Sequence, residues 1–179
     1  MSQTLKVVLS PDPVLRTDTE EVVEFDDALV KLAEDMTRTM YASNGVGIAA
    51  PQVGVLKRLI IVETNYGEDE EIAPLALVNP VIIDHSEDTM IGYEGCLSIP
   101  GVSFEIERYK DVVVSYQDLR GDYHEISASG DILSRCLQHE IDHTHGLTMF
   151  ERLPASQRIS ALSQYNEALN RGAKPGDVE

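Results

Sequence analysis

The sequence predicts an α+β fold, with helices near the beginning and the end of the chain and strands between them. Two observations support this prediction. Apolar residues recur at helical spacing in residues 27–43, 130–145 and 155–170, as they do on the buried face of an amphipathic helix. Between residues 58 and 127 the apolar runs are strand-sized, and turn residues separate them.

The first helix is expected to start at Asp26 or Asp27, because either side chain can cap its free backbone N–H groups. It is expected to end near Ser43, since Asn44 and Gly45 favour chain reversal. The strands that follow are expected at about residues 58–63, 75–84, 104–117 and 123–127.

Polar segments interrupt and follow these strands. Residues 65–71 are polar and acidic, which predicts an exposed loop, and residues 118–122 are typical of a hairpin turn. The second helix is expected at about residues 130–145, and Gly146 is well placed to end it. The tail from about residue 172 contains glycine, proline and acidic residues, and we expect it to fray.

Length and composition point to one globular domain over residues 1–179. The net charge of −17, from 14 basic and 31 acidic residues, argues against non-specific binding to nucleic acids or anionic membranes. The longest apolar runs are too short to span a bilayer, and the amino terminus lacks a signal-peptide pattern. Two cysteines give no disulfide framework, so we expect a reduced, cytoplasmic protein.

The most informative stretch is His139-Glu140-Ile141-Asp142-His143. Residues four apart lie on one face of a helix, so the two imidazoles can reach a single divalent ion. Glu140 would sit beside that ion, where it can take a proton from water. The second helix is therefore predicted to carry a metal site.

Two histidines leave a tetrahedral metal site incomplete. Cys136 shares a helix face with His139, but its apolar neighbours favour a buried structural thiol. His145 points away from the motif and is interpreted as a surface or capping residue. Glu167 is interpreted as one charge on a solvated helix face. Cys96 lies where flanking glycine and proline let the backbone bend sharply enough to present a thiolate.

Three motifs together resemble the peptide deformylase family. They are Gly45-Val46-Gly47-Ile48-Ala49-Ala50-Pro51-Gln52, Glu94-Gly95-Cys96-Leu97-Ser98 and Gln138-His139-Glu140-Ile141-Asp142-His143. The similarity extends from about Pro11 to Leu153. It implies a hydrolase that removes the N-formyl group from the formylmethionine of nascent polypeptides. It also implies antiparallel sheets packed around a central helix that bears the HExxH motif, with helices near both termini.

The resemblance implies one divalent metal ion, ferrous iron in the cell, which zinc, nickel or cobalt can replace. Its ligands would be Cys96, His139 and His143. Glu140 would accept a proton from water and return it to the departing amine. The side-chain amide of Gln52 and the backbone N–H of Leu97 would stabilise negative charge on the formyl oxygen.

The implied substrate is an N-formylmethionyl nascent peptide in extended form. Val46 and Gly95 would hydrogen-bond its backbone, and Gly47 would let that backbone approach. The methionine pocket would draw on Val46, Leu133, Cys136 and neighbours of His139. Transient ribosome contact and a bacterial, phage or organellar origin stay open, and no nucleic-acid or membrane site is expected.

Two other classes of protein share parts of this pattern. A zinc endopeptidase of the HExxH type would need a further ligand, but Met149 stands where the longer metzincin motif has its third histidine. The alternative protease arrangement would use Glu167. A non-catalytic metal-stabilised binding module is the other class, and Glu140 argues against it because a purely structural site needs no such carboxylate.

Overall fold

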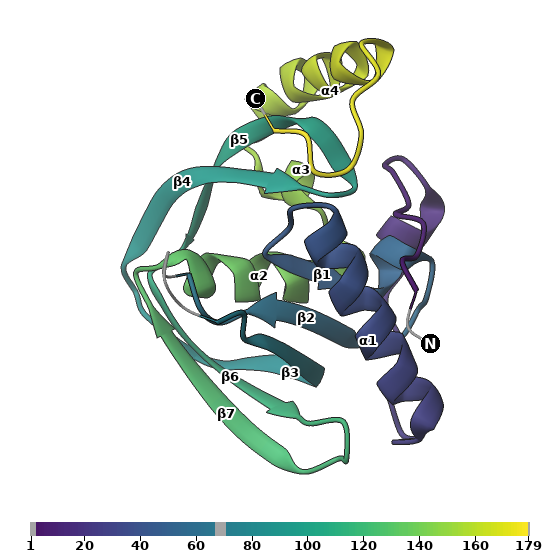
Figure 1. Ribbon diagram of the computed structural model, residues 1–179. Coiled ribbons are helices and arrows are strands. Elements are labelled where there is room, and N and C mark those ends of the chain that lie inside the picture. The colour runs from purple at the N-terminus through teal and green to yellow at the C-terminus, as the bar shows by residue number, and fades with distance from the viewer. Residues whose placement is uncertain (1–2, 67–70, 179) are drawn as a thin grey trace.

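The computed structural model describes residues 3–66 and 71–178, and its elements follow the predicted α+β order (Figure 1). The helical elements are η1 (Pro13–Arg16), α1 (Asp27–Ala42), η2 (Ala50–Val53), α2 (Ile132–Thr144), α3 (Met149–Arg152) and α4 (Ala155–Asn170). The strands are β1 (Gly47–Ala49), β2 (Leu59–Glu63), β3 (Pro74–His85), β4 (Thr89–Cys96), β5 (Ile99–Tyr109), β6 (Asp111–Gln117) and β7 (Tyr123–Ser129).

Two antiparallel sheets surround helix α2. The larger sheet has the strand order β1-β2-β3-β6-β7, and β4 and β5 form a separate long hairpin. Figure 1 shows α2 between the five-stranded sheet and this hairpin, with α1 beside β1 and β2. The predicted arrangement of sheets around a central motif-bearing helix is confirmed.

Helix α1 begins and ends as predicted. The side chain of Asp26 accepts a hydrogen bond from the backbone N–H of Leu29 at 2.9 Å, which satisfies one of the free donors of the first turn. Asn44, with φ of 53°, reverses the chain just after the helix. The buried face of α1 packs against β1 and β2 through Leu29, Ala33, Met36 and Met40.

Helix α2 is buried on both sides, because it lies between the two sheets. Its start is capped by Asp131, whose side chain accepts from the N–H of Ser134 at 2.7 Å. Gly146 has φ of 71° and ends the helix region in the left-handed conformation that glycine favours. Leu137 and Ile141 pack against the larger sheet, so the opposite face of α2 is left for the motif residues.

The β4–β5 hairpin departs from the prediction. Strand β4 was not predicted as a strand, and β5 starts at Ile99 rather than near residue 104. In β4 the outward positions carry exposed Ile91 and Tyr93, while an inward position carries the buried carboxylate of Glu94. This inverted polarity hides the alternation that normally identifies a strand.

Two further segments bear on the predictions. Residues 67–70 of the expected loop 65–71 lie outside the described residues. The expected fraying from about residue 172 differs from the structure, in which the tail folds back on the β4–β5 hairpin (Figure 1). There the N–H of Gly101 donates to the carbonyl of Asp177 at 2.9 Å. Among the described residues, no helix combines the length and apolar character that crossing a membrane requires.

We expect Leu137→Ala to lower the free energy of unfolding by about 2–5 kcal/mol, because it leaves a cavity between α2 and the sheet. Ile159 on α4 is 82% exposed, so Ile159→Ala should change the same quantity by less than about 0.5 kcal/mol. Urea unfolding of both variants measures the difference. Equal losses in the two variants would contradict the placement of Leu137 in the core.

Candidate metal centre

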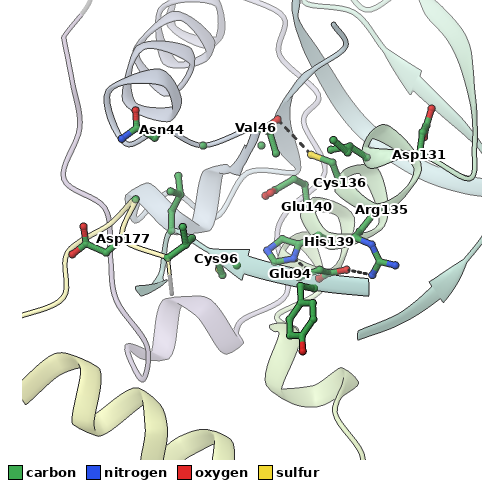
Figure 2. A pocket seen from close by; sticks show the side chains of 18 of the residues that line it. Asn44, Val46, Glu94, Cys96, Asp131, Arg135, Cys136, His139, Glu140 and Asp177 are labelled. Carbon is green, nitrogen blue, oxygen red and sulfur yellow. Dashed lines mark hydrogen bonds and ion pairs between the residues drawn. The ribbon is translucent and has the colours of Figure 1, made fainter. Parts of the chain in front are cut away.

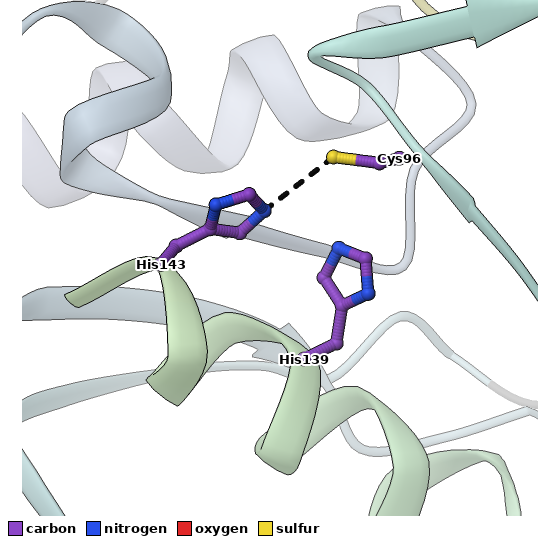
Figure 3. Close-up of side chains that lie close together, drawn as sticks. All are labelled: Cys96, His139 and His143. Atoms are coloured by element: carbon purple, nitrogen blue, oxygen red, sulfur yellow. Dashed lines mark hydrogen bonds between the residues drawn. The ribbon is translucent and has the colours of Figure 1, made fainter. Parts of the chain in front are cut away.

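Two elements bring three potential metal ligands together. His139 and His143 project from α2, and Cys96 is the last residue of β4. One ligand atom from each of the three lies within 4.8 Å of the other two, and all three residues are buried. The sulfur of Cys96 lies 3.4 Å from Nε2 of His143 (Figure 3).

The ring orientations fit a metal site. Nδ1 of His139 lies 2.8 Å from Oε2 of Glu94, and Figure 3 shows the other ring nitrogen turned toward Cys96. A carboxylate on the far nitrogen is the usual way in which proteins orient a metal-binding imidazole. Nδ1 of His143 is buried and has no hydrogen-bond partner among the described residues. The donor set of one sulfur and two nitrogens suits a divalent ion such as zinc or iron and leaves a coordination position open.

Glu94 is held by donors from three side chains. Both its oxygens accept from Arg108, at 2.8 and 2.9 Å, and Oε1 also accepts from Nη1 of Arg135 at 3.0 Å. Burial alone would raise the pKa of Glu94, but the hydrogen bonds from Arg108 and His139 outweigh it and hold the pKa well below its usual range. Glu94 is therefore a permanent carboxylate behind His139.

Arg108 extends this network to the motif helix. Its Nη1 donates to Oδ2 of Asp142 at 2.6 Å, and Asp142 also accepts from Nε of Arg152 at 2.8 Å. The network was not predicted. One available signal was that Glu94 and Cys96 are two residues apart, so in a strand they point to the same side.

The pKa of Glu140 is shifted in the opposite direction from that of Glu94. Glu140 is buried, its Oε2 has no hydrogen-bond partner among the described residues, and burial raises its pKa to about 7. Burial, with the neighbouring His139, lowers the pKa of His143 to about 3, which keeps its imidazole neutral. For His139, burial lowers the pKa, but hydrogen bonds to Cys96 and Glu94 outweigh it and raise the pKa well above its ordinary value.

Gln52 and Leu97 both lie next to the cysteine. The N–H of Ala49 donates to Oε1 of Gln52 at 2.9 Å, which fixes the orientation of the amide. Nε2 of Gln52 then lies 3.5 Å from the sulfur of Cys96 and 3.2 Å from Oγ of Ser98. Leu97 follows Cys96 in the tight turn between β4 and β5. Side-chain and backbone N–H groups thus lie close to the candidate metal ligands.

A cavity of about 600 Å³ opens beside these groups, and Figure 2 shows its labelled side chains. Among the predicted residues, those lining it are Val46, Gly47, Gly95, Cys96, Leu97, Cys136, His139 and Glu140. The prediction for Leu133 is wrong, because Leu133 packs against the larger sheet. Ile132 lines the cavity instead, since on a helix residues 132 and 136 lie on one face and residues 133 and 137 on another.

Gly47 has a packing role that was not predicted. A Cβ atom at this position would lie 2.6 Å from both the sulfur of Cys136 and Oε1 of Glu140. Only glycine therefore lets strand β1 pass this close to the motif helix. The closeness of the strand helps to bury Glu140.

The other residues considered as metal ligands do not belong to this group of three donors. Cys136 is a free, buried thiol whose sulfur donates to the carbonyl of Val46 at 3.4 Å, and burial raises its pKa. His145 caps the end of α2 and lies 3.3 Å from a carboxylate oxygen of Asp18. Glu167 is exposed on α4, and Met149 is part of the core. Within the described residues, the one group identified as able to hold a metal is that of Cys96, His139 and His143.

Three donors that could hold one ion lie beside a cavity that Cys96, His139 and the buried carboxylate of Glu140 line, and this carboxylate can move protons. The fold and the site therefore define a metal-dependent hydrolase. A family model described as polypeptide deformylase matches residues 4–158 of the chain. The chain belongs to the peptide deformylase family. Hydrolases of this family remove the N-formyl group from nascent polypeptides, and this enzyme does the same.

Individual relatives support this assignment over most of the chain. The peptide deformylase of Prochlorococcus marinus is 42% identical over 163 residues, which cover 91% of this chain and 79% of that protein. A peptide deformylase from a Picosynechococcus species is 46% identical over 159 residues, covering 88% and 84%. The crystal structure of peptide deformylase from Ehrlichia chaffeensis superposes with a TM-score of 0.86 at 36% identity, covering 94% and 98% of the two chains.

We expect Glu94→Gln to weaken metal binding by about tenfold to a hundredfold, because an amide cannot support the His139 ring as a carboxylate does. Competition with a chelator measures the dissociation constant. Glu105→Gln is a matched control, since Glu105 is an exposed residue of the same hairpin. Unchanged affinity in Glu94→Gln would mean that this carboxylate does not act on the metal site.

Burial of Glu140 predicts a pH-dependent stability in metal-free protein. Raising the pKa from 4.5 to about 7 means that the folded state keeps its proton more tightly than the unfolded chain does. The stability of the fold should therefore fall between pH 4.5 and 7. Glu140→Gln should remove this loss, so that its stability relative to the wild type rises by about 3 kcal/mol over that range. Urea titrations at several pH values in chelator measure this, and parallel curves for the two proteins would contradict it.

Proposed function

We propose that residues 1–179 form one catalytic domain, and that it carries out deformylation at a metal centre held by Cys96, His139 and His143. The observation that carries this proposal is the convergence of these three buried donors beside one cavity, whose lining includes Cys96, His139 and Glu140. The metal in the cell is proposed to be ferrous iron, with zinc, nickel or cobalt able to replace it, since a thiolate and two imidazoles accept all of these ions. When bound, the ion supplies a Lewis acid and lowers the pKa of nearby water.

Glu140 is proposed as the group that moves the proton. Its pKa of about 7 in the absence of metal lets it accept and release a proton near neutral pH. Glu140 lines the cavity, and its buried Oε2 has no hydrogen-bond partner among the described residues. Glu140 takes a proton from the attacking water and gives it to the amine that leaves.

Gln52 and Leu97 are proposed to stabilise the formyl oxygen as it becomes negative. The amide of Gln52 is fixed by Ala49 before substrate arrives, so little reorganisation is needed. Its Nε2 and the backbone of Leu97 lie on the same side of the site as Cys96.

The substrate is proposed to lie as an extended peptide between β1 and β4. Val46 and Gly95 offer backbone groups there, and both residues are exposed. The methionine side chain enters the part of the cavity that Ile132 and Cys136 line. Gly47 contributes because it has no side chain. A Cβ atom at this position would displace Cys136 and Glu140.

The natural partners are proposed to be N-formylmethionyl nascent chains, met through transient contact with the ribosome. A cytoplasmic location is proposed because both cysteines are unpaired thiols. The endopeptidase alternative is not favoured, because Met149 is a core residue and Glu167 is an exposed residue of α4.

The test is formate release from a formyl-Met peptide by protein purified without oxygen, with the metal content measured on the same sample. Glu140→Gln should keep its metal and lose about 10²- to 10⁴-fold in turnover, because an amide cannot accept the proton. Near-normal turnover in this variant would overturn the role of Glu140.

Two cysteine variants test the ligand set. Cys96→Ala should lose the stoichiometric metal, whereas Cys136→Ala should retain it, since Cys136 contacts the carbonyl of Val46. Retention of metal by Cys96→Ala would instead support a protease-type site made without this thiolate.

A further inference from the structure

The chain after α4 returns to the active site. Residues 172–178 run back along the β4–β5 hairpin toward the end of α1 (Figure 1). At Gly101, a Cβ atom would lie 2.7 Å from Cβ of Ala173 and 2.9 Å from Cβ of Ala168, so β5 and the tail pack closely. The tail is thus a packed segment of the structure.

Two contacts with other segments and one hydrogen bond within the tail hold its end. The carbonyl of Asp177 accepts from the N–H of Gly101 at 2.9 Å, and its carboxylate accepts from the N–H of Lys174 at 2.7 Å. Gly176 has φ of 97°, and a Cβ atom there would overlap the carbonyl oxygen of Ser43. The tail therefore connects the hairpin to the end of α1.

The held segment reaches the cavity. Gly176, Asp177 and Val178 all line it, and Figure 2 shows Asp177 on the opposite side of the site from Cys136. Cγ1 of Val178 lies 3.2 Å from the position that a Cβ of Gly95 would take. Val178 thus lies beside the strand residue proposed to hydrogen-bond the substrate backbone.

The tail forms a wall of the cavity and does not fill it. With the tail in place, the cavity still measures about 600 Å³ and is still lined by Cys96, His139 and Glu140. This volume lies within the usual range for a binding site. The carboxylate of Asp177 accepts a hydrogen bond from the backbone N–H of Lys174, whereas the side chain of Val178 is 71% exposed. The tail therefore offers an apolar contact to whatever lies along β4.

We propose that residues 176–178 are a specificity determinant, and that Val178 favours substrates with an apolar residue after the formylmethionine. This inference rests on the proposed function. It assigns the substrate residues that follow the formylmethionine to the side of the cavity opposite Cys136. An extended peptide turns successive side chains to opposite sides, so a peptide whose methionine enters near Cys136 presents later side chains to other walls.

The test compares kcat/KM for formyl-Met-Leu-Leu-amide and formyl-Met-Ser-Ser-amide, with formyl-Met-amide as the reference substrate for each protein. The wild type should prefer the Leu-Leu over the Ser-Ser peptide by about tenfold, at the low end of what an apolar contact gives. Gly176→Ala, which displaces the tail from Ser43, should remove most of this preference. Val178→Ser should do the same without changing the backbone.

Gly172→Ala is the matched control. Gly172 also has a positive φ, of 86°, but a Cβ there would meet nothing within 4 Å. This variant should keep the wild-type preference, and melting temperatures show whether each variant is folded. A preference that survives in both Gly176→Ala and Val178→Ser, or that is absent in the wild type, would overturn the proposal. No formate from any substrate would overturn the proposed function itself, and the tail proposal with it.

Discussion

The carboxylate of Glu94 joins the two parts of the structure that make the candidate metal centre. It comes from the β4–β5 hairpin, two residues before Cys96, and it contacts Nδ1 of His139 on α2. Arg108 and Arg135 satisfy its other hydrogen-bonding capacity. Because the same strand carries Cys96, the interaction that orients the imidazole also fixes the distance between thiol and histidine. Burial of this charge is tolerated because Arg108, Arg135 and His139 all hydrogen-bond to it.

Two buried glutamates within one site thus have opposite properties. Glu94 is surrounded by cationic and hydrogen-bonding groups and stays ionised, whereas Glu140 lies against Gly47 and Cys136 and holds its proton up to about pH 7. One carboxylate can therefore serve as a fixed support and the other as a proton carrier. The difference comes from their neighbours, since the two side chains are chemically identical.

Local sequence patterns were enough to predict the three long helices and the pair of histidines on α2. The cap at Asp26, the turn at Asn44 and the spacing of His139 and His143 each depend on neighbouring residues alone, and the structure has them where expected. What could not be predicted depends on contacts between distant segments. Strand β4 was missed because its inward position at Glu94 is charged, and that charge makes sense only once Arg108 is opposite. The position of the tail likewise depends on Gly101 and Ser43, which no pattern within residues 172–178 reveals.

The distance along the chain between the candidate metal ligands affects how the protein folds. Cys96 and His143 are separated by 47 positions in sequence, and the strands β5, β6 and β7 lie between them. Closing so long a loop costs conformational entropy, and the three donors lie together only where the hairpin and α2 are docked. A metal ion that binds the converged donors then stabilises the folded state by mass action. With a metal bound at these donors as proposed, starving a cell of that metal would lower the amount of folded protein as well as its activity.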